Sequence, residues 1–323
     1  MQNDIILETK NLCVDYPVKK RSFFEKRKVL SAVSDVSIKI MRGETFGLVG
    51  ESGCGKSTFA DTTLGFVKPS GGEVLYAGKK IEYGDAKNIR EVRKHMQKIF
   101  QDPNASLNPR FTVRDIICEP VRIRKNVDKT EADRLAEDII QAVGLSVSDL
   151  DRYASDFSGG QQQRIAIARA LILKPEYIVC DEPVSALDVS VHAQILNLLM
   201  DMQKKTGTTY LFISHNLAVV KKICSRIAIM YMGKVVEYGN ADAIYNNPKH
   251  PYTKALLSAV LDIDSDKTGN RIILKGDVAS PIDVPAGCRF AARCPVAKTG
   301  CSAADCRLTE VESEHFVACP YSC

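Results

Sequence analysis

The sequence lacks any apolar run long enough to cross a bilayer. A spanning helix needs roughly 18 consecutive apolar residues, and no segment of the 323-residue chain approaches that length. The first residues, Met1-Gln2-Asn3-Asp4, also lack the basic and then apolar pattern of a secretory signal. We therefore expect a cytoplasmic protein that meets membranes only through partners.

The sequence also lacks a strong excess of either charge. A formal net charge of +5 gives no indication of a nucleic acid partner, and none is expected. A hydrophobic content of 45% and a charged content of 26% are ordinary for a globular protein. The chain is long enough for one large domain or two smaller ones with an ample core.

What the chain does contain is a segment typical of phosphate binding. Residues 50–57 fit the pattern G-x-x-x-x-G-K-[ST], after an apolar strand-like run and before a helix-compatible stretch. Glycines let successive backbone N–H groups turn toward phosphates, and the helix N-terminus adds positive potential. We expect Lys56 to bind the β- and γ-phosphates and the Ser57 hydroxyl to bind Mg²⁺. The predicted nucleotide-binding residues of this loop are Gly50, Glu51, Ser52, Gly53, Cys54, Gly55, Lys56, Ser57 and Thr58.

Asp181 and Glu182 follow a buried strand predicted at 177–180. An acidic pair at the tip of a buried strand is costly unless a cation lies nearby. Asp181 is therefore predicted to bind Mg²⁺, and Glu182 is predicted to polarise an attacking water.

A second helix start suited to an anion lies at 158–161. Ser158 is a good N-cap, and Gly159 and Gly160 leave N–H donors free for an anion. The helix is predicted over 161–173, with Gln162 on its surface.

Hydrophobic periodicity predicts the remaining elements. Alternation at 5–16 and 32–40 indicates half-buried strands on either side of a basic loop at 19–28. Strands and helices alternate again from 161 to 213, and a hairpin is predicted at 226–238. Repeated strand–helix units favour an α/β fold with a mostly parallel sheet and flanking helices.

Two segments differ from this pattern. Residues 104–160 are more polar and helical, which predicts an inserted helical subdomain. After residue 262 the composition shifts to Gly, Pro, Asp and Cys. We therefore predict a nucleotide-binding domain over 1–262 and a Cys-rich extension over 263–323.

The chain resembles the nucleotide-binding subunit of an ABC transporter. The resemblance rests, in chain order, on the phosphate loop, segment 157–161, the pair Asp181-Glu182 and His215. The resemblance covers about residues 5–260. It implies a P-loop NTPase core with an antiparallel β subdomain, hydrolysis of ATP, and a head-to-tail dimer with ATP between two subunits at each of two sites. In such a dimer the γ-phosphate held by one subunit would contact four residues of the other: Ser158, Gly159, Gly160 and Gln161.

The resemblance implies further roles. Gln101 corresponds to a glutamine that contacts Mg²⁺ and the attacking water and couples to the membrane partner. His215 corresponds to a histidine that contacts the γ-phosphate, so Glu182, His215 and Gln101 are the predicted catalytic residues. Tyr16 either stacks on adenine or packs in the core. The predicted Mg²⁺ ligands are Ser57, Gln101 and Asp181.

Segments 247–257 and 280–290 resemble the ATPases of oligopeptide and dipeptide permeases. The long insert after Tyr16 and the stretch Ala105-Ser106-Leu107-Asn108-Pro109 resemble the second of the two ATPase types in those systems. This implies a similar but non-identical ATPase partner, two multispanning permease subunits, and indirectly an extracytoplasmic substrate-binding protein, with this chain on the cytoplasmic face of the membrane. Nickel and glutathione importers share these features, so an ATPase of such an importer is the alternative. A soluble ABC ATPase and a redox sensor are more distant alternatives.

Six of the eleven cysteines lie in the last 36 residues: Cys288, Cys294, Cys301, Cys306, Cys319 and Cys323. The spacing of the first three and Cys319 would suit a [4Fe–4S] cluster, a structural Zn²⁺, or unligated or disulfide-bonded thiols. The peptide-importer ATPases carry an iron–sulfur cluster at corresponding cysteines, so a cluster on Cys288, Cys294, Cys301 and Cys319 is expected. Cys306 or Cys323 could replace a ligand. Such a cluster would staple a segment too small to form its own core.

Overall fold

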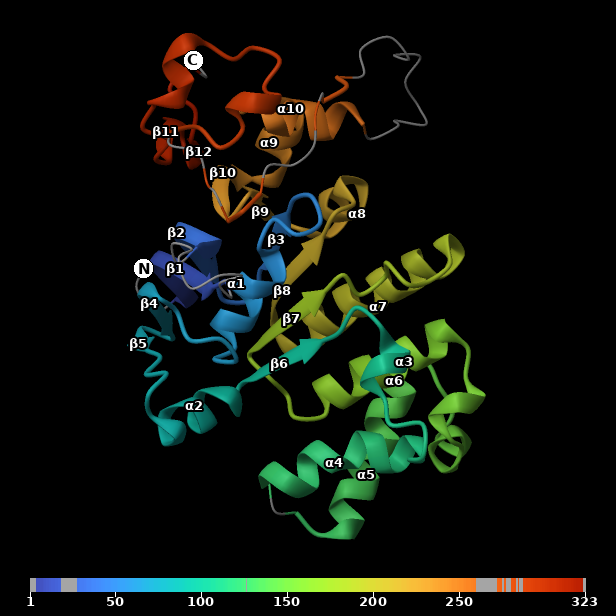
Figure 1. Ribbon diagram of the computed structural model, residues 1–323. Helices are drawn as coiled ribbons and strands as arrows, with labels where there is room; N and C mark the ends of the chain where they lie inside the picture. The colour runs from blue at the N-terminus through green and yellow to red at the C-terminus, as the bar shows by residue number, and fades with distance from the viewer. Residues whose placement is uncertain are drawn as a thin grey trace. The chain divides into compact units, whose positions relative to one another are not determined.

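The computed structural model describes residues 4–18, 28–125, 127–259, 272–274, 276, 280–282, 284 and 287–321. The basic loop predicted at 19–28, apart from Lys28, lies outside these residues, as do the boundary predicted near residue 262 and Cys323. The chain divides into two compact units (Figure 1). Unit 1 consists mainly of Met41–Glu44 and Ile81–Ile213, and unit 2 of Gln2–Ile40, Thr45–Lys80 and Ser214–Cys323.

Unit 2 contains a four-stranded sheet in the order β2-β1-β4-β5. β1 runs antiparallel to β4, which runs antiparallel to β5. Inward residues such as Leu12 and Val14 are fully buried, because alternate side chains of a strand face the same side. The predicted antiparallel β subdomain is confirmed. Its strands are β1 (Ile5–Pro17), β2 (Val29–Met41), β4 (Gly71–Tyr76) and β5 (Lys79–Lys80).

A second sheet of unit 2 has the strand order β11-β12-β10-β9-β3. β3 and β9 are parallel, whereas β9, β10, β12 and β11 pair antiparallel in turn. The predicted hairpin is confirmed as β9 and β10, and the chain's last strands extend its sheet. The bounds are β3 (Thr45–Val49), β9 (Arg226–Tyr231), β10 (Lys234–Asn240), β11 (Thr309–Glu312) and β12 (His315–Val317).

A buried carboxylate joins three elements of unit 2. Glu237 on β10 accepts hydrogen bonds from the backbone N–H groups of Lys249 (2.8 Å) and His250 (2.9 Å). It also lies 2.7 Å from Nε2 of the buried His315 on β12. Burial lowers the pKa of His250 to about 3, so its neutral ring accepts the N–H of Tyr252 as a helix cap. The C-terminal strand is thereby fastened to the hairpin and to the helix that follows it.

The helices of unit 2 are mostly short. They are α1 (Lys56–Thr63), α8 (Leu217–Ile223), α9 (Ala241–Asn246) and α10 (Pro251–Ser258), with single turns η4 (Ala291–Arg293) and η5 (Thr299–Ser302). From the sequence, the helix after the phosphate loop is predicted over 57–64, and α1 begins one residue earlier and ends one residue earlier.

Unit 1 contains three parallel strands in the order β6-β7-β8. Their registers place Met96 opposite Tyr177 and Tyr177 opposite Thr209. All five residues of β7 are buried, as expected for a central parallel strand. The bounds are β6 (Met96–Ile99), β7 (Tyr177–Asp181) and β8 (Thr209–Ser214).

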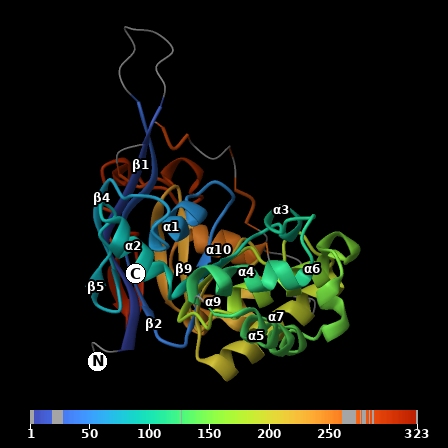
Figure 2. The same cartoon turned by 90° about the horizontal axis from the view of Figure 1, so that it is seen from below.

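The helices of unit 1 include the predicted insert. They are α2 (Ala86–Arg93), α3 (Pro103–Ser106), α4 (Val113–Lys125), α5 (Lys129–Ala142), η2 (Val147–Asp151), η3 (Ala154–Asp156), α6 (Gly159–Leu171) and α7 (Val189–Thr206). α4 and α5 pack against each other and against α6 (Figure 2). Within the described part of the chain, no helix is both long and apolar enough to cross a bilayer.

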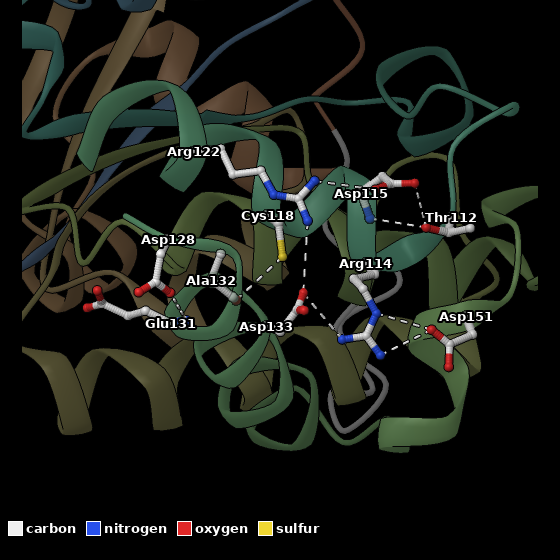
Figure 3. Close-up of polar contacts among 10 residues, drawn as sticks. All are labelled: Thr112, Arg114, Asp115, Cys118, Arg122, Asp128, Glu131, Ala132, Asp133 and Asp151. Carbon is white, nitrogen blue, oxygen red and sulfur yellow. Dashed lines mark hydrogen bonds and ion pairs between the residues drawn. The ribbon is translucent and has the colours of Figure 1, made fainter. Parts of the chain in front are cut away.

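Ion pairs fix the insert as one body. Asp133 on α5 lies between two arginines of α4, 3.5 Å from Arg114 and 3.9 Å from Arg122 (Figure 3). Arg114 also lies 3.1 Å from Asp151 at the end of η2, and Arg122 lies 3.4 Å from Asp115. These shared partners connect α4, α5 and η2, and fully buried side chains such as Ile117 and Ile140 fill the space between them.

Candidate nucleotide site

The phosphate loop in unit 2 occupies the turn between β3 and α1, as the sequence predicted. A Cβ on Gly50 would lie 2.2 Å from the carbonyl oxygen of Met230, and one on Gly55 would lie 2.1 Å from that of Ala32. Gly55 also has φ of +106°, a conformation that L side chains rarely adopt. Both positions require glycine, because the backbone of the loop lies directly against the backbone of β2 and β9.

Lys56 folds over this loop. Its ammonium donates hydrogen bonds to the carbonyl oxygens of Gly50 (2.8 Å) and Glu51 (2.9 Å), and the residue is buried. Burial raises the pKa of the neighbouring Cys54 thiol, so Cys54 stays neutral. Of these two side chains, only Lys56 is charged. Ser57, at the start of α1, is exposed.

Two further predicted residues of unit 2 are solvent-accessible. Tyr16 is 39% exposed near the end of β1, so it is not a core tyrosine. His215 follows β8 in an exposed position. Both rings are thus accessible to a ligand.

In unit 1, the structure brings Gln101 and Glu182 together. The Gln101 amide Nε2 lies 3.3 Å from Oε2 of Glu182. Glu182 has φ of +47°, a left-handed conformation that costs a non-glycine residue on the order of 1 kcal/mol. Its backbone N–H donates to Ile213 (3.1 Å) and its carbonyl accepts from Ser185, and these bonds hold the strained residue in place.

Asp181 lies beside a cation that the sequence reasoning missed. Lys98 on β6 is opposite Val179 on β7, so Asp181, two residues later, faces the same side of the sheet. The Lys98 ammonium lies 3.0 Å from Oδ2 of Asp181, and only 9% and 11% of the two side chains are exposed. The signal was a lysine within a short strand, next to a strand that ends in an acid.

The helix start at 158–161 forms a closed cap. The side-chain oxygen of Gln161 accepts the backbone N–H of Ser158 (3.0 Å) and its hydroxyl (3.2 Å). Ser158 and Gln161 are exposed, and α6 begins at Gly159, two residues earlier than predicted. The expectation that Gln162 lies on the surface is wrong: it is 6% exposed, and its amide donates to the carbonyl of Ala154.

The predicted site residues therefore fall into separate groups. Unit 1 brings together Gln101, Asp181 and Glu182, and unit 2 forms the phosphate loop. The Ser158 segment, Tyr16 and His215 lie on other elements.

The described cysteines of the extension lie near one another. Burial raises the pKa of Cys288 to about 11, and the nearby thiols of Cys306 and Cys301 act in the same direction. All described cysteines are free thiols. Over residues 287–321 and the other described ranges, no group of three or more His, Cys, Asp or Glu side chains is arranged to hold a metal ion. The described cysteines of the predicted ligand set thus lie near one another, but their side chains are not arranged around a common metal position.

We expect Lys98→Met to lower the free energy of unfolding by on the order of 3 kcal/mol, because it leaves the buried Asp181 carboxylate without this cation. The matched control is Lys80→Met, since Lys80 pairs with Glu73 where 48% and 43% of the two side chains are exposed. That loss should stay below about 1 kcal/mol. Urea unfolding measures both, and equal losses would show that the buried Lys98 pair contributes no more to stability than the exposed Lys80 pair.

Comparison with known proteins matches both parts of the chain. Residues 33–185 match the family model described as ABC transporter, and residues 236–301 match the one described as oligopeptide/dipeptide transporter, C-terminal region. The chain is 48% identical over 321 residues to the oligopeptide transport ATP-binding protein OppF of Haemophilus influenzae, covering 98% of this chain and 97% of the relative. It is 47% identical to OppF of Salmonella typhimurium, covering 98% and 96%.

A solved structure extends the likeness to the fold. The ATP-binding cassette MJ0796, a dimer in a post-hydrolysis state bound to ADP and Pi, superposes with a TM-score of 0.64 at 27% identity, covering 73% of this chain and 99% of that one. The P-loop NTPase fold expected from the sequence is confirmed. The chain belongs to the ATP-binding subunits of the ABC transporter family.

Proposed function

We propose that this chain is the ATP-hydrolysing subunit that drives an importer of peptides. The observation that carries the proposal is the pairing, in one chain, of a nucleotide-binding region with a C-terminal region of the oligopeptide/dipeptide transporter type. The near full-length identity to two oligopeptide transport ATP-binding proteins supports it. A nickel or glutathione importer is the alternative within the family, and a soluble ABC ATPase is a more distant one.

Unit 2 would supply the groups that bind the nucleotide. In unit 2, backbone N–H groups of the loop at 50–58 would bind the phosphates, with Lys56 neutralising their charge. Tyr16 would stack on the adenine, and His215 would contact the γ-phosphate. These roles suit the accessible positions of Tyr16 and His215.

In unit 1, Glu182 would accept a proton from the attacking water, and Gln101 would orient that water. The 3.3 Å contact between their side chains supports this pairing. The oxygen atoms of Asp181 and Gln101, and in unit 2 that of Ser57, are hard donors that suit Mg²⁺. When bound, Mg²⁺ neutralises charge on the β- and γ-phosphates.

The assembly would be a head-to-tail pair of ATPase subunits. The helix start at Ser158 supports this, because Ser158 and Gln161 are exposed at the N-terminus of α6, where the helix dipole favours an anion. The dimeric state of the related cassette also supports it. We propose a similar but non-identical ATPase as the partner, two multispanning permease subunits, and a location on the cytoplasmic face of the membrane.

Glu182→Gln tests the hydrolytic role. The variant should bind Mg-ATP about as well as the wild type but lower kcat by about 10²- to 10⁴-fold, because the amide cannot accept the proton. Glu176→Gln is the matched control, since Glu176 lies in the same unit and pairs with Arg42 at an exposed position. Phosphate release and ATP binding measure the two effects. Robust turnover in Glu182→Gln would remove this residue from the mechanism.

Reconstitution tests the transported substrate. In liposomes that contain this chain and its co-purifying subunits, identified by mass spectrometry, a peptide-loaded binding protein should stimulate ATP hydrolysis severalfold. The same binding protein without peptide should not. Stimulation by nickel or glutathione in place of peptides would select the alternative importers.

For the extension we propose the expected [4Fe–4S] cluster on Cys288, Cys294, Cys301 and Cys319, with Zn²⁺ as the alternative. The cysteine spacing and the mutual proximity of the described thiols support a shared ligand. Protein purified without oxygen should be brown and contain iron and sulfide. Cys288→Ser should lose this iron, whereas Cys13→Ser, in β1, should keep it. Colourless protein with one zinc per chain would rule the cluster out.

A further inference from the structure

The C-terminal extension contacts the phosphate loop directly within unit 2. Arg293, at the end of η4, places Nη1 2.9 Å from Oε2 of Glu51 in the loop. Only 11% of the Arg293 side chain and 27% of the Glu51 side chain are exposed. The two residues are 242 positions apart in sequence. This is a well-shielded ion pair at the loop predicted to hold a triphosphate.

A second contact reaches the same residue. The backbone N–H of Glu51 donates to the hydroxyl of Tyr252 on α10, at 3.1 Å. The Tyr252 ring is fully buried and lies 4.7 Å from the ring of Tyr231 and 5.3 Å from that of Phe290, centroid to centroid. The Arg293 guanidinium lies 6.0 Å from the centre of the Tyr231 ring. The aromatic cluster of Tyr231, Tyr252 and Phe290 therefore supports both groups that hold Glu51.

Glu51 poses an electrostatic problem for a phosphate loop. Its carboxylate is an added negative charge on a segment whose ligand is itself strongly negative. Lys56, the lysine predicted to bind the phosphates, donates to the carbonyl of Glu51, so the backbone of Glu51 contacts the phosphate-binding group. At a shielded site, like charges repel more strongly than they do in water. An unpaired Glu51 would therefore oppose a triphosphate, and the opposition would grow with the charge of the ligand.

We propose that Arg293 is a positioning residue for ATP: it neutralises Glu51 and draws the carboxylate toward the extension, so that the loop presents only donors and positive charge to the phosphates. The extension thus acts on the nucleotide site of its own subunit. Because Arg293 directly precedes Cys294, ATP affinity depends on the folded state of the cysteine-rich segment. This inference rests on the proposed function, in which residues 50–58 bind ATP.

The test is a double-mutant cycle on nucleotide affinity, measured by calorimetry with the full chain. Arg293→Ala should weaken Mg-ATP binding about tenfold, which corresponds to about 1.4 kcal/mol. In the Glu51→Ala background the same substitution should change the affinity less than about twofold, because the carboxylate that Arg293 neutralises is absent. Arg293→Lys, which keeps the charge, should recover most of the affinity.

Two controls separate charge from folding. Arg307→Ala, in the same extension and paired with Asp305 at an exposed position, should leave ATP affinity unchanged. The loss in Arg293→Ala should be larger for ATP than for ADP, since the triphosphate carries more charge. An equal loss in both Glu51 backgrounds, or an equal loss for both nucleotides, would overturn the proposal. Wild-type protein that binds no ATP would instead overturn the proposed function.

Discussion

The nucleotide site depends on one constraint, the shape of the backbone between Val49 and Lys56. Gly50 and Gly55 lie so close to the carbonyl groups of Met230 and Ala32 that neither position has room for a Cβ. A cradle of backbone N–H groups binds an anion well only if its donors are already in place, because reorganising them would cost part of the binding energy. Here two neighbouring strands fix that geometry before any nucleotide arrives.

The C-terminal residues contact the phosphate loop through packed side chains of the same unit. Glu237 fastens β12 and the start of α10 to the hairpin, and the aromatic cluster carries Tyr252 and Arg293 to Glu51. The extension is therefore packed into the same unit as the phosphate loop. Its folding and the shape of the loop are connected through packed side chains, which are costly to rearrange one at a time.

Much of this arrangement could be predicted from the sequence. Strong local patterns identified the phosphate loop, the strands at 5–16 and 226–238, and the acidic end of β7, because each depends on residues close together in the chain. The helix α2 was not predicted: it is only eight residues long, and its apolar face consists of Ile89 and Val92, neither of which is fully buried.

What could not be predicted depends on contacts between distant segments. The partner of Lys98 follows from the register of β6 against β7, and that of Arg293 from packing across most of the chain. Gln162 was expected on the helix surface, but its side chain is buried and its amide donates to the carbonyl of Ala154. In each case a polar side chain is buried because a particular partner is present, and that partner cannot be identified from a single sequence.

The most direct test of the account is a structure of the Glu182→Gln assembly with Mg-ATP. The triphosphate should lie in the loop at 50–58 of one subunit, and Ser158 of the opposite subunit should donate to its γ-phosphate. A pocket completed within a single subunit, with Ser158 far from every phosphate, would contradict this prediction.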